Sequence, residues 1–475
     1  MNRKKKPLHM GGKLLTLLQL LLSVGLLAVV WNSGLLPMKY IVVLGIVILV
    51  LFGITFGLQY LKNKVYIVGI VLSILISIGL TFGIIYMMKA DKLMADVGGA
   101  TYKTDNMIVV VKNESPASNL LDAKDYRFGM QNAVDQENNQ LMREDIEKAV
   151  GRDILVEEYD TLAEEAQALL EGRIEAAIYN EAFAGIIDDT VEGYSDQVRI
   201  LYQYGIDTEI EQEETNIEEP FNIYISGIDV DGPITTNSRS DVNIIMTVNP
   251  NTKKILLTTT PRDYYVKIPG ISGDQKDKLT HAGIYGVDVS MNTLESIYGI
   301  DITYYARVNF TSLINIVDAL GGVDVNSDYA FTTTHGGYEI QQGMNHLDGN
   351  AALGFSRERY SFEDGDNQRG RNQEAVLTAI LNKAMSPAIL TNANQILASV
   401  SDSVETNMTQ DEMAKFINQQ LADASAWSIE STAAAGTGDQ QACFSSGDQI
   451  LYVMNPDEAS VQAASAKMKQ ILEGN

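Results

Sequence analysis

The stretch from Leu353 to Glu374 reads LGFSRERYSFEDGDNQRGRNQE and carries four arginines within fifteen residues: Arg357, Arg359, Arg369 and Arg371. Asp364 and Asp366 lie between the two arginine pairs. The first pair follows an apolar run, and an extended chain would place Arg357 and Arg359 on the same face. The stretch therefore brings four guanidinium groups close together in the sequence.

The second half of this stretch opens an apolar-periodic segment over 375–380 and predicts the first turn of a helix. Arg369 and Gln373 are four residues apart and would lie one above the other on that helix. Guanidinium groups that converge near a helix N-terminus suit a multiply charged oxyanion such as a phosphate or pyrophosphate. The alternative is a surface salt-bridge network with the neighbouring acids, and the stretch taken alone favours neither reading.

Charge is divided unevenly along the 475 residues. Ten of the 35 Lys/Arg and one of the 61 Asp/Glu residues lie in 1–92, which gives that segment a net charge of +9. The remaining 25 basic and 60 acidic residues give the rest of the chain −35. So acidic a domain would repel nucleic acid, which we do not expect as a partner.

Three apolar runs in the first 92 residues, 14–36, 40–61 and 65–88, each approach the about 20 residues that cross a bilayer. A cleaved signal peptide is the alternative for the first run, but two more runs follow and no small-residue cleavage site is evident. The basic cluster 3–6 and the pair Lys62 and Lys64 favour the cytoplasm. Three crossings would place everything after residue 92 on the extracellular face.

Cysteine and histidine usage narrows the class further. Cys443 is the single cysteine, so no internal disulfide can form. A large domain outside the cell without disulfides favours a bacterial envelope over a eukaryotic secretory pathway. The four histidines show no metal-ligand spacing, and no zinc site is predicted.

Residues 96–215 are predicted to form a separate accessory domain. Strands are expected over 107–111, 126–130, 154–159 and 176–179, and helices over 138–150 and 161–170, which indicates a small α/β domain. The segments YRFGMQNAVDQENN and ILVEEYDTLAEEAQALLEGRIEAAIYNE resemble one lobe of a periplasmic solute-binding protein. A single lobe lacks the facing half of a ligand cleft, so a docking or spacer role is favoured over solute binding. The acidic stretch 209–219 is the expected linker.

The main domain is assigned to 216–475. A strand over 221–228 and a hairpin of strands over 242–248 and 254–260 are followed by helices over 289–298 and 311–320. The tail is placed in the same domain, with a mobile surface loop over 433–442, a strand over 450–454 and a helix over 461–472. The ends of the first three strands deliver charged residues, as in sites of open α/β sheets: Asp229, Arg239, Asp241, Arg262 and Asp263.

Five motifs, in this order, resemble the LytR–CpsA–Psr family over about 221–390: FNIYISGIDVDG, RSDVNIIMTVNPNTKKILLTTTPRDYYVKIPG, KLTHAGIYG, INIVDALGGVDV and GMNHLDGNAALGFSRERYSFEDGDNQRGRNQEAV. The three-span N-terminus and the inserted domain look like the CpsA-like, capsule-associated branch. The resemblance implies an α-β-α sandwich with a deep apolar pocket for a polyprenyl tail. It also implies an enzyme of a Gram-positive bacterium, on the extracellular face of the cell membrane. Such an enzyme moves a capsular polysaccharide, wall teichoic acid or another glycopolymer from undecaprenyl pyrophosphate to peptidoglycan, through a phosphodiester.

The resemblance assigns roles residue by residue. Asp229 and Asp241 match the acids that hold Mg²⁺, and six further positions match pyrophosphate contacts: Arg239, Arg262, Arg357, Arg359, Arg369 and Gln373. Asp263 would orient Arg262. Asp366 would be either a general base for the acceptor hydroxyl or an N-cap of the following helix, and the cap or an arginine-orienting role is favoured.

The chain departs from the family pattern at one place in the motif. It reads Arg371-Asn372-Gln373 where many members have Arg-Gln, so Asn372 is unexpected and Arg371 receives no role. His281 fits the K-x-x-H-A motif and is expected to be structural.

Two other functions remain open from the sequence. One is a non-catalytic polyprenyl-phosphate-binding regulator of capsule or wall-polymer biosynthesis, and the other is a polyprenyl-pyrophosphate phosphatase with water as the acceptor. The same arginines would serve all three functions, but a binder has less need of two carboxylates beside a bound anion. The transferase is therefore favoured, with peptidoglycan, the membrane and the capsule-biosynthesis machinery as expected partners.

Overall fold

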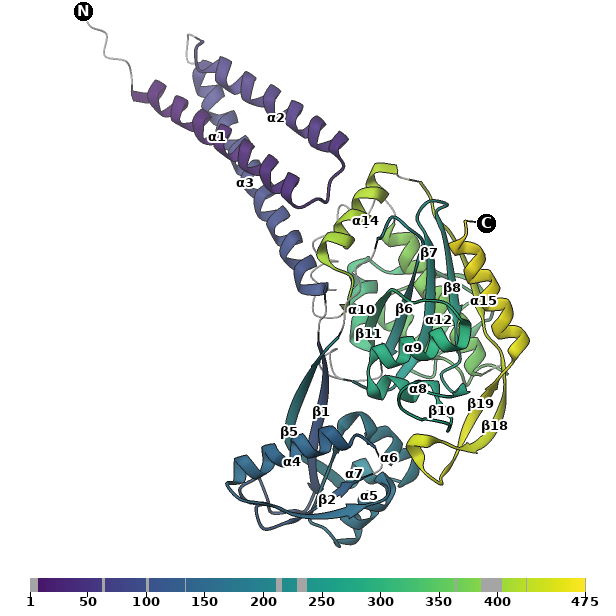
Figure 1. The fold of residues 1–475 in the computed structure, drawn as a ribbon. Helices are drawn as coiled ribbons and strands as arrows, with labels where there is room; N and C mark the ends of the chain where they lie inside the picture. The colour runs from purple at the N-terminus through teal and green to yellow at the C-terminus, as the bar shows by residue number, and fades with distance from the viewer. Residues whose placement is uncertain are drawn as a thin grey trace, which may run out of the picture. The chain divides into compact units, whose positions relative to one another are not determined.

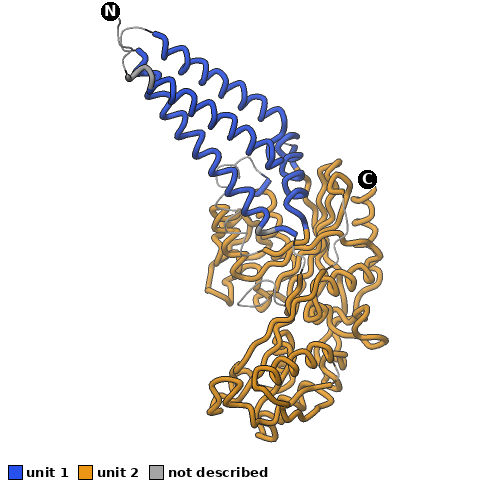
Figure 2. The backbone as a smooth tube through the Cα atoms, turned by 60° about the vertical axis from the view of Figure 1, so that its left-hand side comes forward, with its two compact units in different colours: residues 1–99, 384–402, 408–426 blue, residues 100–383, 403–407, 427–475 orange. Residues whose placement is uncertain are grey.

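The computed structural model, drawn in Figure 1, describes residues 7–61, 65–99, 102–132, 134–210, 216–228, 237–363, 365–385, 404–423 and 425–474. The chain forms two compact units (Figure 2). The first comprises residues 1–99, 384–402 and 408–426, and the second comprises 100–383, 403–407 and 427–475.

The first unit contains the three apolar helices: α1 (Pro7–Asn32), α2 (Met38–Leu58) and α3 (Val65–Val97). All three are long and apolar enough to cross a membrane, as the sequence predicted. Helix α14 (Gln410–Asp423) belongs to the same unit. Its Asn418 side chain donates to the Gly34 carbonyl at 2.7 Å, and Gln410 donates to Asp91 at 2.7 Å. A segment from the far end of the sequence thus packs against the α1–α2 connection and the end of α3.

The accessory domain opens the second unit. Its five-stranded sheet has the order β3-β2-β4-β1-β5. Strands β2, β3 and β4 run parallel, whereas β1 is antiparallel to both β4 and β5. The elements are β1 (Tyr102–Lys112), β2 (Arg127–Gln131), α4 (Gln136–Val150), β3 (Leu155–Tyr159), α5 (Leu162–Glu171), β4 (Ala176–Asn180), α6 (Ala184–Thr190), α7 (Tyr194–Gln197) and β5 (Val198–Glu209).

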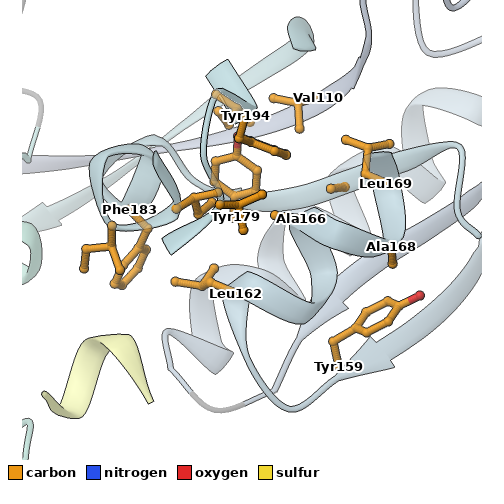
Figure 3. Packing of buried hydrophobic residues seen from close by; sticks show 14 of the residues in the cluster. Val110, Tyr159, Leu162, Ala166, Ala168, Leu169, Tyr179, Phe183 and Tyr194 are labelled. Atoms are coloured by element: carbon orange, nitrogen blue, oxygen red, sulfur yellow. The ribbon is translucent and has the colours of Figure 1, made fainter. Parts of the chain in front are cut away.

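The accessory core explains why these segments fold. Helix α5 buries Leu162, Ala166 and Leu169 against Tyr179 of β4 and the ring of Tyr194 (Figure 3). Thr161 caps α5 by accepting from Glu164 N–H, and Gly172 ends it in the left-handed region. The α/β architecture predicted for this segment is therefore confirmed.

A six-stranded mixed sheet organises the rest of the second unit, in the order β16-β11-β6-β7-β8-β17. Its strands are β6 (Phe221–Ile228), β7 (Ser240–Asn249), β8 (Lys254–Thr259), β11 (Tyr304–Asn309), β16 (Val404–Thr406) and β17 (Ser428–Ala433). The predicted hairpin is confirmed, because β7 and β8 pair antiparallel from Ile244–Thr259 to Asn249–Lys254.

Helices cover both faces of this sheet. On one face, Tyr224, Ile245 and Leu256 pack with α9 (Val287–Tyr298) and α15 (Glu458–Leu472). The other face carries α10 (Phe310–Ala319), α11 (Gly349–Arg357) and α12 (Asp366–Ala384). The domain is an α-β-α sandwich, as predicted. The remaining elements are β9 (Tyr265–Val266), β10 (Asp277–Lys278), α8 (Leu279–Ala282), β12 (Val323–Ser327), β13 (Phe331–Thr332), β14 (Glu339–Ile340), β15 (Gly343–Leu347), β18 (Gly436–Ala442) and β19 (Ile450–Pro456).

The prediction of a mobile loop over 433–442 is wrong. Ala433 ends β17, which pairs parallel with the edge of β8, and Gly436–Ala442 forms β18, which pairs antiparallel with β19. This segment is rich in Ala, Gly and Gln, which have low strand propensity, so its conformation comes from neighbouring strands that offer unpaired backbone groups.

Candidate active site

Charged residues from three elements meet at one edge of the main sheet. Asp241 lies in β7, Arg262 follows β8, and α12 supplies Asp366, Arg369 and Gln373. All five line one small pocket, which we call the polar pocket. Gly365, with φ +51°, turns the chain into α12 and lets the charged first turn of that helix face the strand ends. The structure thus brings together residues that are 132 positions apart in sequence, from Asp241 to Gln373.

An ion pair joins the two strand ends. Arg262 Nη1 lies 2.9 Å from Asp241 Oδ1, and the Thr280 hydroxyl donates to the same oxygen at 3.3 Å. Burial opposes ionisation of Asp241, but the positive charges of Arg262, Arg239 and Arg369 outweigh it and lower the pKa of this carboxyl. Asp241 is therefore a carboxylate at neutral pH.

Arg369 is held on α12 by the acid at the start of the same helix. Its Nη2 lies 2.9 Å from Asp366 Oδ1, one helical turn away, and 11% of its side chain is exposed. Burial and the guanidinium groups of Arg262 and Arg359 lower the pKa of Arg369, although Asp366 and Asp241 oppose them. Confined positive charge of this kind is stabilised by an anion in the pocket. Because Asp366 is the first helical residue and pairs with Arg369, its geometry matches the predicted arginine-orienting role.

A second, apolar cavity of about 110 Å³ adjoins the polar pocket. It lies between the sheet and helices α10, α11 and α12, and we call it the apolar cavity. Its walls include Ile225, Val242, Leu313, Leu353, Val376 and Leu377. Gln373 lines both spaces, so a ligand with a charged head and an apolar chain could occupy both at once.

The prediction that Arg357 and Arg359 share one face of an extended chain is wrong. Arg357 is the last residue of α11, a helix whose N-cap Asp348 accepts from Ala351 N–H. Arg357 lies at the rim of the apolar cavity with its guanidinium 4.0 Å from the centroid of the Phe310 ring. Arg359 follows the helix, and its Nη2 donates to Tyr360 Oη at 2.6 Å. The structure does not place Arg359 among the residues that line the polar pocket.

Glu358, between these two arginines, was missed by the sequence reasoning. Its side chain is 1% exposed and accepts hydrogen bonds from the backbone N–H groups of Thr334, Tyr360 and Ser361. These bonds fix the turn that separates Arg357 from Arg359. In the sequence, Glu358 stands between two arginines, and this pattern suggests a local ion pair instead of hydrogen bonds to the backbone.

Asn372, the departure from the family pattern, has a structural role. Its Nδ2 donates to the Phe355 carbonyl at 3.1 Å and so ties α12 to α11. Its Oδ1 accepts from Gln368, which in turn accepts from Arg371 Nε at 2.8 Å. Arg371 thus supports this network and does not line the polar pocket.

Two other predicted residues, Asp263 and Arg239, do not line the polar pocket. Asp263 lies 3.2 Å from Lys278 Nζ and 3.8 Å from Arg262 Nε, which fits an orienting role. Arg239 Nη1 lies 3.1 Å from Asp189 of the accessory domain. The structure therefore does not bring Arg239 into the pocket lining.

His281 is buried, and its Nδ1 lies 2.6 Å from Asp277 Oδ1. Asp277 also accepts from Ser445 N–H at 3.0 Å, so the pair anchors the 443–447 loop. The geometry shows the structural histidine that the sequence favoured.

One of the two predicted magnesium ligands can be located. Asp241 offers its carboxylate to the polar pocket, whereas Asp229 lies outside the described residues. Within the described part of the chain, no group of three or more His, Cys, Asp or Glu side chains is arranged to hold a metal. Mg²⁺ usually takes one or two carboxylates and completes its shell with phosphate oxygens and water, so a pocket with Asp241 fits the ion.

Several known proteins are similar to this chain. The LytR_cpsA_psr family model matches residues 189–470. A polyisoprenyl-teichoic acid–peptidoglycan teichoic acid transferase TagU of Enterococcus faecalis is 39% identical over 203 residues, which span 42% of this chain and 65% of that protein. The protein of the same name from Bacillus cereus is 35% identical over 256 residues, which span 54% of this chain and 80% of that protein. The crystal structure of Bacillus subtilis TagV aligns with a TM-score of 0.46 at 24% identity, and covers 54% of this chain and 98% of that one.

Proposed function

The chain belongs to the LytR_cpsA_psr family, and on this premise we propose that it is a membrane-anchored phosphotransferase. Its donor would be a glycopolymer on polyprenyl pyrophosphate, and its acceptor a hydroxyl of peptidoglycan. The observation that carries the proposal is the junction at Gln373, where the polar pocket meets the apolar cavity. The names of the TagU relatives support this donor and acceptor.

The polar pocket and the apolar cavity bind different parts of the donor. The apolar cavity takes the start of the polyprenyl chain, because its lining buries methyl and methylene groups from water. Arg262 and Arg369 contact the pyrophosphate in the polar pocket, where low exposure strengthens their attraction for it. Gln373 stands where the pyrophosphate joins the chain.

The reaction is a single phosphoryl transfer. The acceptor hydroxyl loses its proton to water as its oxygen bonds to the phosphorus that carries the glycan, the bridging P–O bond breaks, and polyprenyl monophosphate leaves. Arg262 and Arg369 stabilise the charge that develops on the leaving phosphate. Asp366 keeps Arg369 in place through their 2.9 Å ion pair.

Magnesium is part of the proposal. Asp241, together with Asp229, would hold Mg²⁺, which neutralises pyrophosphate oxygens when it is bound. We expect EDTA treatment of the full-length protein to abolish transfer and added Mg²⁺ to restore it. Full transfer activity in the presence of EDTA would show that the reaction needs no divalent metal ion.

The membrane orientation and the cargo also belong to the proposal. The basic residues near α1 and between α2 and α3 favour a cytoplasmic N-terminus, which places the second unit on the extracellular face. The proposed cargo is a capsular polysaccharide or a wall teichoic acid-like polymer. The three-helix N-terminus and the accessory domain resemble the capsule-associated branch, whereas the TagU relatives are named for teichoic acid. We also propose a Gram-positive envelope, which the same resemblance implies.

The test is performed in cells that carry the substitutions Asp241→Ala or Arg369→Ala. We expect both variants to fold and to release polymer into the medium instead of attaching it to the wall. Asp324→Ala is the matched control, because this exposed acid pairs with His346 away from both spaces. Normal anchoring in both site variants would refute the transferase. Free phosphorylated polymer as the wild-type product would indicate a phosphatase instead, and lipid binding without turnover would indicate a regulator.

A further inference from the structure

A side chain of the accessory domain pairs with Arg239, which lies beside the polar pocket. Arg239 directly precedes β7, and its Nη1 lies 3.1 Å from Asp189 Oδ2 on α6 of the accessory domain. The guanidinium lies against Gly185 of the same helix, where an added Cβ would fall 2.6 Å from Arg239 Cζ. The glycine thus leaves room for the arginine, and Asp189 supplies its counter-charge.

Other contacts hold the two domains together around this pair. Lys103 of β1 lies 3.0 Å from Asp288 on α9. Asn237, two residues before Arg239, donates from Nδ2 to Asp105 at 3.0 Å, and its backbone N–H donates to the Thr104 carbonyl at 3.2 Å. The backbone that carries Arg239 is therefore fixed against the accessory domain, and the side chain is the part that can change partners.

Arg239 stands close to the polar pocket without lining it. Asp241, two residues further along, faces the pocket, and the charge of Arg239 helps to lower the pKa of that carboxyl. The Arg239 side chain is 35% exposed and that of Asp189 is 46% exposed, so water can replace either partner. A pair this exposed shifts an equilibrium by no more than about fivefold.

We propose that Asp189 is a positioning residue that holds Arg239 outside the polar pocket, and that a bound pyrophosphate competes with Asp189 for this guanidinium. The inference rests on the proposed function and gives the accessory domain a role in it. Binding of the pyrophosphate would draw Arg239 from Asp189 to the anion, and release of the product would return it.

The test measures binding of geranylgeranyl pyrophosphate to the full-length protein in detergent by calorimetry. Asp189→Asn is expected to lower the Kd by about two- to fivefold, because the competing charge is removed. Gly185→Ala is expected to lower the Kd in the same direction without any change of charge, because its methyl group displaces the guanidinium. In transfer assays the same variants lower KM, whereas a loss of folding would lower kcat as well.

Two controls separate this effect from general electrostatics. Asp188→Asn removes the same charge from the neighbouring position, where the carboxylate accepts from Ser195, and should leave the Kd unchanged. Adding Arg239→Gln to Asp189→Asn should abolish the gain. Unchanged or weaker binding by Asp189→Asn, or an equal gain from Asp188→Asn, would overturn the competition while the proposed function stands. If wild-type protein binds no geranylgeranyl pyrophosphate, both fail.

Discussion

Replacement of Arg369 by methionine should separate ligand binding from stability. The Arg369 side chain is only 11% exposed, and its guanidinium lies 2.9 Å from Asp366 in the polar pocket. A hydrogen bond to a charged group contributes about 1.5–3 kcal/mol, and 1.4 kcal/mol is a factor of about ten. We therefore expect Arg369→Met to raise the Kd for geranylgeranyl pyrophosphate by about 10- to 150-fold.

The same substitution should not destabilise the fold. Burial, together with the charges of Arg262 and Arg359, lowers the pKa of Arg369, which means that the folded protein disfavours this charge in the absence of ligand. We expect a melting temperature equal to or above that of the wild type, measured by calorimetry on the full-length protein.

Arg371→Met provides the matched control. This residue lies two positions along the same helix, carries the same charge and bonds Gln368 instead of lining the polar pocket. Its substitution should change the Kd by less than about twofold, as expected of a rim charge screened by solvent. Equal losses of affinity in the two variants would refute the assignment of Arg369, as would a loss in Arg369→Met that tracks unfolding.

Three further predictions concern the residues around and beyond the site. Glu358→Ala removes the carboxylate that accepts from the backbone N–H groups of Thr334, Tyr360 and Ser361, so it should lower the free energy of unfolding by about 1–3 kcal/mol. Glu363→Ala in the same turn should not, and equal melting of the two variants would contradict this. Leu377→Gln in the apolar cavity should weaken the binding of geranylgeranyl pyrophosphate by about 1.5–3 kcal/mol at most and leave the binding of inorganic pyrophosphate unchanged. An equal loss of affinity for both ligands would count against the cavity as the binding site of the isoprenoid chain. Burial raises the pKa of Glu165 to about 8, so its contribution to stability is complete below about pH 4.5 and is lost as the pH rises through 8, by up to about 5 kcal/mol. Glu165→Gln should therefore reduce the pH dependence of the melting temperature between pH 5 and 9. An unchanged pH dependence would show that other groups cause it.

The predictability of the site varied with the range of the interactions involved. Asp241, Arg262 and Arg369 could be placed together because strand ends and a helix start converge at one edge of a sheet. The partner of Arg239 could not, because Asp189 lies 50 residues earlier in another domain and only tertiary structure brings it near. Glu358 was overlooked for a related reason, since its partners are backbone groups that no side-chain pattern reveals.

The fold shows the same division. Long periodic segments such as α12 and the β7–β8 hairpin followed from local pattern. Two shorter segments did not. The helical conformation of Gly349–Arg357 depends on its cap at Asp348 and on its packing, and β18 forms against β19 despite a composition with little strand preference. The attachment of α14 to the membrane helices rests on contacts between residues more than 300 positions apart, such as Gln410 and Asp91.

The most direct test of the account is an experimental structure of the full-length protein with geranylgeranyl pyrophosphate. We expect the pyrophosphate within hydrogen-bonding distance of Arg262 and Arg369, with the isoprenoid chain passing Gln373 into the cavity lined by Val242 and Leu377. A pyrophosphate bound elsewhere, or a chain that lies outside this cavity, would contradict it.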